Sequence, residues 1–272
     1  MLSREFPKIA IVMLSILLVA NVVSADFENL PLTNLTRVGN YYRYSPSRLN
    51  ILLGDLGSSV GLRNLGVTPY KNNLSFISFG TRSARKVVYI ARQHGDEQAS
   101  SFMAEGFLEQ AAYDSSYLSK FRTYAVPMVN PDGALKNTLG NSISQNLNRC
   151  WSNSSCYEIN KIRDRLNMIN LTSSDIFIDQ HALNSGELYS YIIISSKQKL
   201  NSSVCNIVKK YLPTFQCSID NYPAYGTARW YFYNKGLKYS ILIETSQSNK
   251  TYTPAYVNNL GKNLVNLLKN LP

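Results

Sequence analysis

Short apolar runs alternate with helix-like stretches along most of this chain. Six runs have the length and composition of buried strands: 74–80 (LSFISFG), 86–91 (KVVYIA), 124–129 (YAVPMV), 175–179 (DIFID), 189–195 (YSYIIIS) and 239–244 (YSILIE). Helical patterns occupy 98–113, 157–168 and 254–271, and the last shows apolar spacing at Val257, Leu260, Leu264, Val265 and Leu268. This alternation predicts an α/β fold with a mixed, mostly parallel central sheet and helices on both faces.

The N-terminal residues 1–25 read as a secretory signal. Arg4 and Lys8 precede the apolar run IAIVMLSILLVANVV, and the small residues of VSA end just before Asp26. An uncleaved membrane anchor is the alternative. No later segment is long and apolar enough to span a bilayer, so we expect no stable membrane insertion after cleavage. The sequence therefore predicts an exported protein, periplasmic or secreted, with one domain at 26–272 and a monomeric state.

The net charge excludes few partners. The chain carries 28 Lys and Arg against 17 Asp and Glu, a formal net charge of +11, but the excess is not concentrated in one block. No stripe of Arg and Lys interleaved with aromatic residues occurs along the sequence. This distribution favours acidic partners or surfaces in general and predicts no nucleic-acid partner.

The four cysteines of an exported chain are most simply two disulfides, and four cysteines allow three pairings. We favour Cys150 with Cys156 and Cys205 with Cys217, because each pair closes a short local loop. A zinc cluster is the alternative, but the chain has no C-x-x-C spacing to support it.

Polar residues follow the predicted strands where those strands end. His94 and Glu97 follow KVVYIA, Asn130 follows YAVPMV, His181 follows the 175–179 run, and Glu244 ends YSILIE. Ligands of parallel α/β sheets gather at the carboxyl ends of the strands, where loops from separate strands converge. These side chains are therefore expected to lie close together.

A catalytic zinc needs about three His or carboxylate ligands and an open position for water. The chain has only 2 histidines, so a site with two His ligands must use both His94 and His181. Glu97, on the same short loop as His94, is the natural third ligand, and Glu244 is the candidate proton-shuttling carboxylate. The alternatives are a polar surface turn at His94 and a core histidine at His181. The joint placement favours one zinc ion per chain.

Four segments of the chain resemble the M14, or carboxypeptidase A-like, family of zinc carboxypeptidases. They are HGDE at 94–97, NPDG at 130–133, NLNR at 146–149 and IDQH at 178–181. The resemblance implies ligand roles for His94, Glu97 and His181. It also implies that Asn148 and Arg149 bind the terminal carboxylate of a substrate, for which the planar guanidinium is suited. A surface salt bridge is the alternative for Arg149.

The segment YNKGLKYSILIE at 233–244 resembles the final catalytic strand of that family over its whole length. This implies the general-base role for Glu244, and an ungapped count places Tyr222 at the position of the family's mobile capping tyrosine. The resemblance spans roughly residues 40–271 and is strong only at these motifs. It implies a metallocarboxypeptidase catalytic domain whose partner is a peptide with a free C-terminal carboxylate.

Three positions depart from the family pattern. Leu139 stands where the family has an arginine that polarises the scissile carbonyl, and Lys136 is the nearest cation that could replace it. Asn146 stands where Asp is usual, and Cys150 stands where Asn is usual. A bond between Cys150 and its predicted partner would pin the loop beside the carboxylate site. Asp96 is expected to shape the turn or to orient a ligand rather than to bind zinc.

The same count places Arg229 at the specificity pocket of the family, where an acidic residue accompanies preference for basic C-terminal residues. An arginine there predicts a leaving residue with an acidic side chain, or diaminopimelate, which carries a side-chain carboxylate too. The chain resembles the compact, exported bacterial members that trim murein peptides, and this implies a muropeptide as the leading substrate class. The alternative is an Arg229 that points to solvent.

Two other functions remain open at this stage. A zinc-dependent deacylase of the aspartoacylase type shares an HGDE-like pair and an Asn-Arg element, whereas NPDG and the match ending at Glu244 favour a carboxypeptidase. A catalytically inactive secreted binding module is the non-enzyme alternative. The presence of Glu244 argues against it, because a pure binder has no need of the proton-shuttling acid.

Overall fold

The computed structural model of the protein describes residues 31–32, 35, 37–38, 41–183, 186–200, 203–248 and 251–272. The predicted signal at 1–25 and its cleavage position lie outside these residues. Within the described ranges, no helix has both the length and the apolar character needed to cross a membrane.

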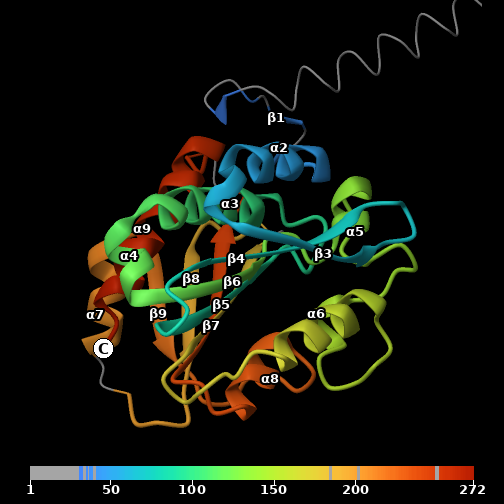
Figure 1. The fold of residues 1–272 in the computed structure, drawn as a ribbon. Helices are drawn as coiled ribbons and strands as arrows, with labels where there is room; N and C mark the ends of the chain where they lie inside the picture. Colours follow the sequence, from blue (N-terminus) through green and yellow to red (C-terminus); the bar gives the residue numbers. More distant parts are fainter. Residues whose placement is uncertain are drawn as a thin grey trace, which may run out of the picture.

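An eight-stranded sheet forms the centre of the molecule, in the order β3-β4-β6-β5-β7-β10-β8-β9 (Figure 1). Among its described pairs, β6/β5, β5/β7, β7/β10 and β8/β9 are parallel, and β3/β4, β4/β6 and β10/β8 are antiparallel. The strands are β3 (Gly61–Val67), β4 (Asn73–Gly80), β5 (Arg85–Ala91), β6 (Phe121–Val126), β7 (Ile176–Leu183), β8 (Ser190–Ser195), β9 (Phe215–Ile219) and β10 (Tyr239–Ser246), with a separate pair of β1 (Arg37–Val38) and β2 (Tyr41–Tyr42). The predicted mixed, mostly parallel α/β sheet is confirmed.

Helices cover both faces of the sheet. The described helices are α2 (Pro46–Leu56), α3 (Gln98–Tyr113), α4 (Ser115–Lys120), α5 (Pro131–Lys136), α6 (Tyr157–Asn167), α7 (Ser203–Tyr211), α8 (Ala228–Asn234) and α9 (Pro254–Asn270), with 3-10 turns η2 (Gly57–Ser59) and η3 (Leu147–Arg149). Figure 1 shows α3, α4 and α9 on one face and α6 and α8 on the other. Each layer has its own apolar core, so each face of the sheet is buried.

The α3 and α9 helices cross with their backbones in contact. A Cβ at Gly106 of α3 would lie 1.9 Å from the Asn258 carbonyl oxygen, and one at Gly261 of α9 would lie 2.0 Å from the Met103 carbonyl oxygen. Only glycine permits this approach, because a Cβ atom in a folded protein does not come within 3.0 Å of another heavy atom. The crossing holds α3, which begins directly after the candidate ligand Glu97, in a fixed position over the sheet.

The pleat of the sheet decides which polar side chains share a face. On β7, Phe177 packs into the α6/α8 core, so Asp179 and His181 point to that same face. Glu244 of β10 is the register partner of His181, and Tyr191 of β8 is in turn the partner of Glu244. The fold therefore brings these four groups to one edge of the α6/α8 face.

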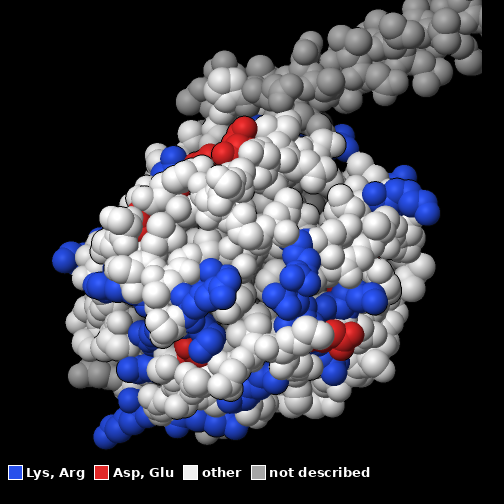
Figure 2. All heavy atoms as spheres, viewed as in Figure 1, with Lys and Arg blue, Asp and Glu red and all other residues white. Residues whose placement is uncertain are grey.

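Positive charge gathers on one side of the molecule. Figure 2 shows Lys and Arg collected over the lower half of the view, over α6, α8 and nearby strand ends, with few Asp or Glu among them. Some of these cations lie over aromatic rings contributed by other elements: Arg163 lies 5.6 Å from the Tyr231 centroid, and Arg165 lies 5.1 Å from that of Phe76. The interleaving arises from the fold, which explains why no such stripe occurs along the sequence.

Candidate metal centre and carboxylate site

Three side chains converge at the carboxyl ends of β5 and β7. His94 lies on the loop after β5, Glu97 precedes α3, and His181 lies on β7; one ligand atom from each lies within 4.8 Å of the others. His94 Nδ1 is 2.6 Å from Glu97 Oε1, and His181 Nδ1 is 2.9 Å from Glu97 Oε2. The carboxylate thus stands between the two Nδ1 atoms. Two imidazole nitrogens and a carboxylate in this arrangement fit a divalent metal ion.

Electrostatics tie the three groups together. Burial alone would raise the pKa of Glu97, but the two histidines that contact its oxygens lower the pKa to about 2. Burial alone would lower the pKa of His181, but Asp179 and Glu97 raise it well above its ordinary value. The Glu97 carboxylate is therefore ionised at neutral pH and can bind a cation.

The other ring nitrogen of each histidine is also held. His94 Nε2 lies 3.1 Å from Asn146 Oδ1, and His181 Nε2 lies 3.0 Å from Asp179 Oδ1. Both imidazoles therefore present Nδ1 to Glu97 and Nε2 to an oxygen. Metal-binding histidines in proteins are typically oriented by such a second contact.

The loop between β5 and α3 is shaped by its sequence. Arg92 is fully buried in a left-handed conformation (φ 60°) and donates from Nε and Nη2 to the Gly95 carbonyl. A Cβ at Gly95 would lie 2.0 Å from the Gly133 carbonyl carbon, so the HGDE turn requires glycine. Among the described hydrogen bonds, none joins the Asp96 side chain to either histidine; its backbone carbonyl accepts from Gln98 N and Gln247 Nε2. This placement agrees with the expected turn-shaping role.

The NPDG segment (130–133) packs against the loop between β5 and α3. Asn130 caps α5 by accepting from Gly133 N at 2.8 Å, and its amide donates to the Gln93 and Leu139 carbonyls. Asp132 accepts hydrogen bonds from Tyr70 N and Asn72 Nδ2. These contacts are structural, and they fix the backbone on which His94 is mounted.

Glu244 is the acid nearest to the three-residue cluster on the neighbouring strand. Its Oε2 atom is buried and has no hydrogen-bond partner among the described residues. Burial raises its pKa to about 8, and Glu97, Asp179 and Glu187 also raise it, while His181 acts in the opposite direction. A carboxyl with this pKa can exchange a proton near neutral pH.

Tyr191 is a site residue that the sequence analysis missed. It is half-buried opposite Glu244, and burial together with Glu244 and two other acids raises its pKa to about 12, while Arg229 lowers it. Ile193 and Leu242, the next residues on the same face, are also only partly buried. No sequence pattern marked Tyr191, because the partial exposure of alternate residues on β8 and β10 is visible only in the structure. Ser240, on the same face of β10, donates to the Arg229 carbonyl, so these side chains form a strip that leads from Glu244 toward Arg229.

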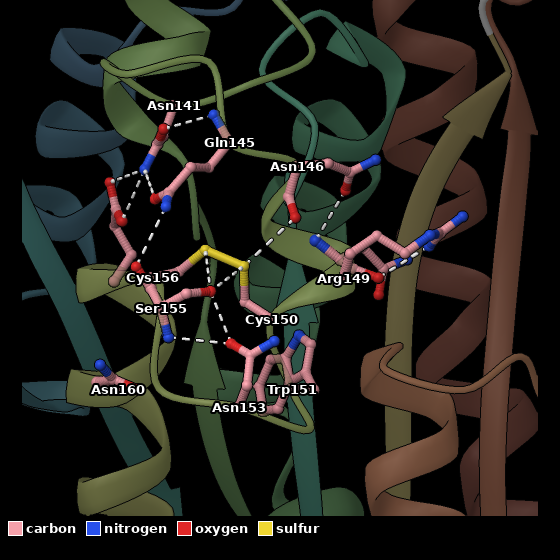
Figure 3. The surroundings of a disulfide bond; sticks show 12 residues. Asn141, Gln145, Asn146, Arg149, Cys150, Trp151, Asn153, Ser155, Cys156 and Asn160 are labelled. Carbon is pink, nitrogen blue, oxygen red and sulfur yellow. Dashed lines mark hydrogen bonds between the residues drawn. A yellow bond between two sulfur atoms is a disulfide. The ribbon is translucent and has the colours of Figure 1, made fainter.

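Arg149 is exposed and immediately precedes the loop 150–156, which Figure 3 shows closed by a disulfide. Its Nη1 donates to the Asn148 carbonyl at 2.8 Å, and within the described ranges it has no acidic partner. The alternative of a surface salt bridge is therefore not what the structure shows. The guanidinium keeps donors available for a ligand.

Asn148 has a different environment from the one expected. Its Oδ1 accepts from Ala228 N at 3.0 Å, and its Nδ2 lies 3.1 Å from His181 Nε2. The side chain is buried between β7 and α8 rather than turned outward beside Arg149. A contact with a substrate carboxylate stays a prediction that would need one of the remaining amide hydrogens.

Both favoured disulfides are present. Cys150 is bonded to Cys156, and Cys205 is bonded to Cys217. Figure 3 shows that the first bond closes residues 150–156, which include Trp151, directly after the segment that carries Asn146 and Arg149. The disulfide therefore anchors the end of the segment that approaches both histidines.

Arg229 does not point to solvent. It is buried at the start of α8, and its Nη2 lies 3.2 Å from Asp220 Oδ2. Its Nη1 atom is buried and has no hydrogen-bond partner among the described residues. One face of the guanidinium is therefore available to an acceptor that comes from outside the chain.

The remaining predicted residues lie around this site. Tyr222 is 90% exposed, and its capping role stays a prediction. Lys136 lies with Nζ 5.3 Å from the Tyr70 ring centroid, and the exposed Leu139 offers its carbonyl to Gly95 N. The replacement of the family's carbonyl-polarising arginine by Lys136 stays a prediction, and the contact with Tyr70 does not favour it.

Comparisons with known proteins agree with this geometry. The model of the succinylglutamate desuccinylase/aspartoacylase catalytic domain family matches residues 83–271. No match was found among curated proteins.

Solved structures show the same fold. A metallo-carboxypeptidase from Burkholderia cenocepacia has a TM-score of 0.72 and 22% identity, covering 83% of this chain and 68% of that chain. A metallo-carboxypeptidase from Pseudomonas aeruginosa, in complex with (2-guanidinoethylmercapto)succinic acid, has a TM-score of 0.65 and 20% identity, covering 84% and 68%. Thrombin activatable fibrinolysis inhibitor has a TM-score of 0.65 and 14% identity, covering 90% and 79%. The predicted carboxypeptidase-like fold is confirmed.

Proposed function

We propose that this chain, which belongs to the succinylglutamate desuccinylase/aspartoacylase catalytic domain family, is a zinc-dependent carboxypeptidase. It would remove a C-terminal residue that bears a side-chain carboxylate, either an acidic amino acid or diaminopimelate. His94, Glu97 and His181 would hold one zinc ion. When bound there, zinc would supply an activated water molecule and would polarise the scissile carbonyl.

The observation that carries the proposal is the buried, unpartnered Nη1 of Arg229. A buried guanidinium donor without an acceptor is costly, and a ligand carboxylate would satisfy it with a charge-assisted hydrogen bond. Ser240 lies on the same face of β10 as Glu244 and donates to the Arg229 carbonyl at 2.8 Å, so the arginine lies at the far end of the strip that begins at the candidate base. The side chain of the leaving residue would lie along this strip and end at Arg229.

The other residues then have defined tasks. Arg149 would bind the α-carboxylate of the leaving residue, and the exposed Tyr222 would close over it. Glu244 would accept a proton at its unpartnered Oε2 and return it to the leaving amine, a transfer suited to a pKa near neutrality. An internal peptide bond would leave Arg149 without its carboxylate, so the site would select chain ends.

Muropeptides are the leading substrate class because diaminopimelate offers both an α-carboxylate and a distant second carboxylate. Such substrates occur outside the cytoplasm. The two disulfides are typical of exported proteins, and we include export to the periplasm or medium in the proposal.

A deacylase is the second candidate, favoured by the family model that matches residues 83–271. The name of that family describes enzymes that release glutamate or aspartate from a small acyl group. The side-chain carboxylate of either leaving group could also bind Arg229. The two candidates differ on the acyl side of the bond. Leu139, which stands at the position expected beside the scissile carbonyl, is exposed and leaves room for a peptide on that side, so we place the carboxypeptidase first.

The test is hydrolysis of a substrate panel by the purified protein, with and without a chelator, read by mass spectrometry. The panel contains muropeptides, peptides ending in Glu, Phe and Lys, and the small amides N-succinylglutamate and N-acetylaspartate. We expect cleavage of the muropeptide and the Glu peptide, abolished by the chelator. Equal or better cleavage of the Phe or Lys peptide contradicts the acidic preference, and exclusive cleavage of the small amides establishes the deacylase.

The variant Glu244→Gln separates an enzyme from a binding module. We expect it to retain zinc and to lose turnover, because the amide cannot accept the proton. Turnover at the wild-type rate by this variant contradicts the role of Glu244.

A further inference from the structure

A chain of buried hydrogen bonds runs from the disulfide-closed loop to His181. Trp151 Nε1 donates to Gln93 Oε1 at 2.7 Å, and Gln93 Nε2 donates to Asp179 Oδ1 at 2.7 Å. The same Asp179 oxygen lies 3.0 Å from His181 Nε2. Asp179 and Gln93 are fully buried, so these groups have no access to bulk water.

Two competing amide groups also face His181 Nε2. Asn148 Nδ2 lies 3.1 Å away, and Gln93 Nε2 lies 3.2 Å away. The orientation of each amide is fixed: the Asn148 oxygen accepts from Ala228 N, and the Gln93 oxygen accepts from the Trp151 indole, which can only donate. Both groups therefore turn an N–H donor toward the ring nitrogen. Without another contact, these two donors would favour the tautomer of His181 in which Nε2 is unprotonated and Nδ1 carries the proton.

We propose that Asp179 is a positioning residue that keeps the proton on His181 Nε2 and so leaves Nδ1 free to bind the metal. Among the described residues its carboxylate is the one acceptor that contacts Nε2, and a charged acceptor outweighs neutral donors at similar distance. Gln93 and Trp151 hold the carboxylate in place. This inference rests on the proposed metal site.

The two candidate histidine ligands differ in the group that orients Nε2. Asn146 Oδ1 accepts from Asn148 N at 3.0 Å, so it is the oxygen of that amide that faces His94 Nε2. His94 Nε2 is thus oriented by a neutral oxygen, and no donor opposes it among the described residues. His181, which faces two donors, has the carboxylate. In this chain the anionic support of the metal site lies on Asp179, whereas Asn146 occupies the position where Asp is usual.

The test compares zinc affinities, measured by competition with a chromophoric chelator in the absence of substrate. Removal of an outer contact to a ligand histidine typically lowers metal affinity about 10- to 100-fold, and we expect this loss for Asp179→Leu. We expect Asp179→Asn to stay within a few-fold of wild type, because Gln93 orients the new amide oxygen toward Nε2. Asn148→Leu in the Asp179→Leu background should restore part of the loss, since it removes an opposing donor.

Ring nitrogen NMR of the zinc-loaded wild type provides a second measurement that needs no variant. The chain has 2 histidines, so the spectrum can be assigned directly. We expect both rings to bind zinc through Nδ1 and to carry a proton on Nε2. Coordination of His181 through Nε2, or wild-type zinc affinity in a folded Asp179→Leu variant, overturns the inference. Neither readout depends on hydrolysis, so failure of the proposed activity would not affect them.

Discussion

Glu244 is a carboxyl whose ionisation opposes folding in the metal-free protein. Its pKa of about 8 exceeds the ordinary value of 4.5, so the folded state holds a proton that the unfolded chain releases between these pH values. The stability contribution is therefore fully present below pH 4.5 and is lost as pH rises toward 8, by up to about 1.4 kcal/mol per pH unit.

The variant Glu244→Gln cannot ionise at this position. We expect the metal-free variant to be more stable than the metal-free wild type at pH 8 and of similar stability near pH 4. Urea unfolding at the two pH values measures the difference, and identical pH dependence of both proteins contradicts the raised pKa. Bound zinc should abolish the effect, because a nearby cation favours the carboxylate.

Arg229 should govern the choice of leaving residue. We expect Arg229→Met to lower kcat/KM for a Glu-terminated peptide about 10- to 100-fold, the equivalent of one charge-assisted hydrogen bond. Cleavage of a Phe-terminated peptide should change little. Arg165→Met, which removes an arginine that stacks on Phe76 away from the site, serves as the matched control. An equal loss for both peptides would indicate damage to the fold rather than lost specificity.

At this scale the sequence predicted the candidate ligands that the structure brings together, but not the residues that contact them. The scarcity of histidine paired His94 with His181, and an acid ending an apolar strand marked Glu244. Asp179 was interpreted only as the last residue of a strand. It lies two positions before His181, however, so both side chains are on the same face of that strand. Asn148 was expected to bind substrate, yet it is buried between His181 and Ala228. Contacts between distant segments, such as Trp151 with Gln93, have no signal in a single sequence.

The crossing of α3 and α9 is the element contact most sensitive to a single methyl group. Gly261→Ala would place a Cβ 2.0 Å from the Met103 carbonyl oxygen, so the helices must move apart. Overpacking of this kind costs about 1–3 kcal/mol, and we expect the free energy of unfolding to fall by that amount. Chemical denaturation measures it.

Gly54→Ala in α2 is the control, because a Cβ there has nothing within 4 Å. That variant should be stabilised by about 0.5–1 kcal/mol, since alanine replaces glycine in a helix. An unchanged stability of Gly261→Ala would show that the two helices do not need their close approach.

The elements found from the sequence are those with a strong apolar pattern. The predicted helices at 98–113, 157–168 and 254–271 agree with α3, α6 and α9 to within one residue at each end. The strand β3 was missed because it is a largely exposed, glycine-containing edge, and β9 because it is a short edge strand. The strand β7 extends to Leu183, beyond the predicted end, because Gln180 and His181 interrupt the apolar run although both are buried.

The whole molecule should respond to the metal through folding stability. The three candidate ligands come from the β5 loop, the start of α3 and strand β7, so a bound ion would join segments that are separated by 84 positions between Glu97 and His181. The unfolded chain does not hold these ligands together, so a metal would bind the folded state preferentially. Zinc at 100 times its Kd should therefore raise the free energy of unfolding by about 2.7 kcal/mol.

Removal of zinc with a chelator should reverse this gain, and calorimetry or denaturant unfolding with and without zinc measures it. Glu97→Gln should lose the response, because the variant lacks the carboxylate that lies between the two Nδ1 atoms. Glu244→Gln should keep the response, because Glu244 is not a proposed ligand. If zinc stabilises the wild type and Glu97→Gln equally, the ion binds elsewhere in the molecule. If zinc does not stabilise the wild type, the metal has no place in the proposed mechanism.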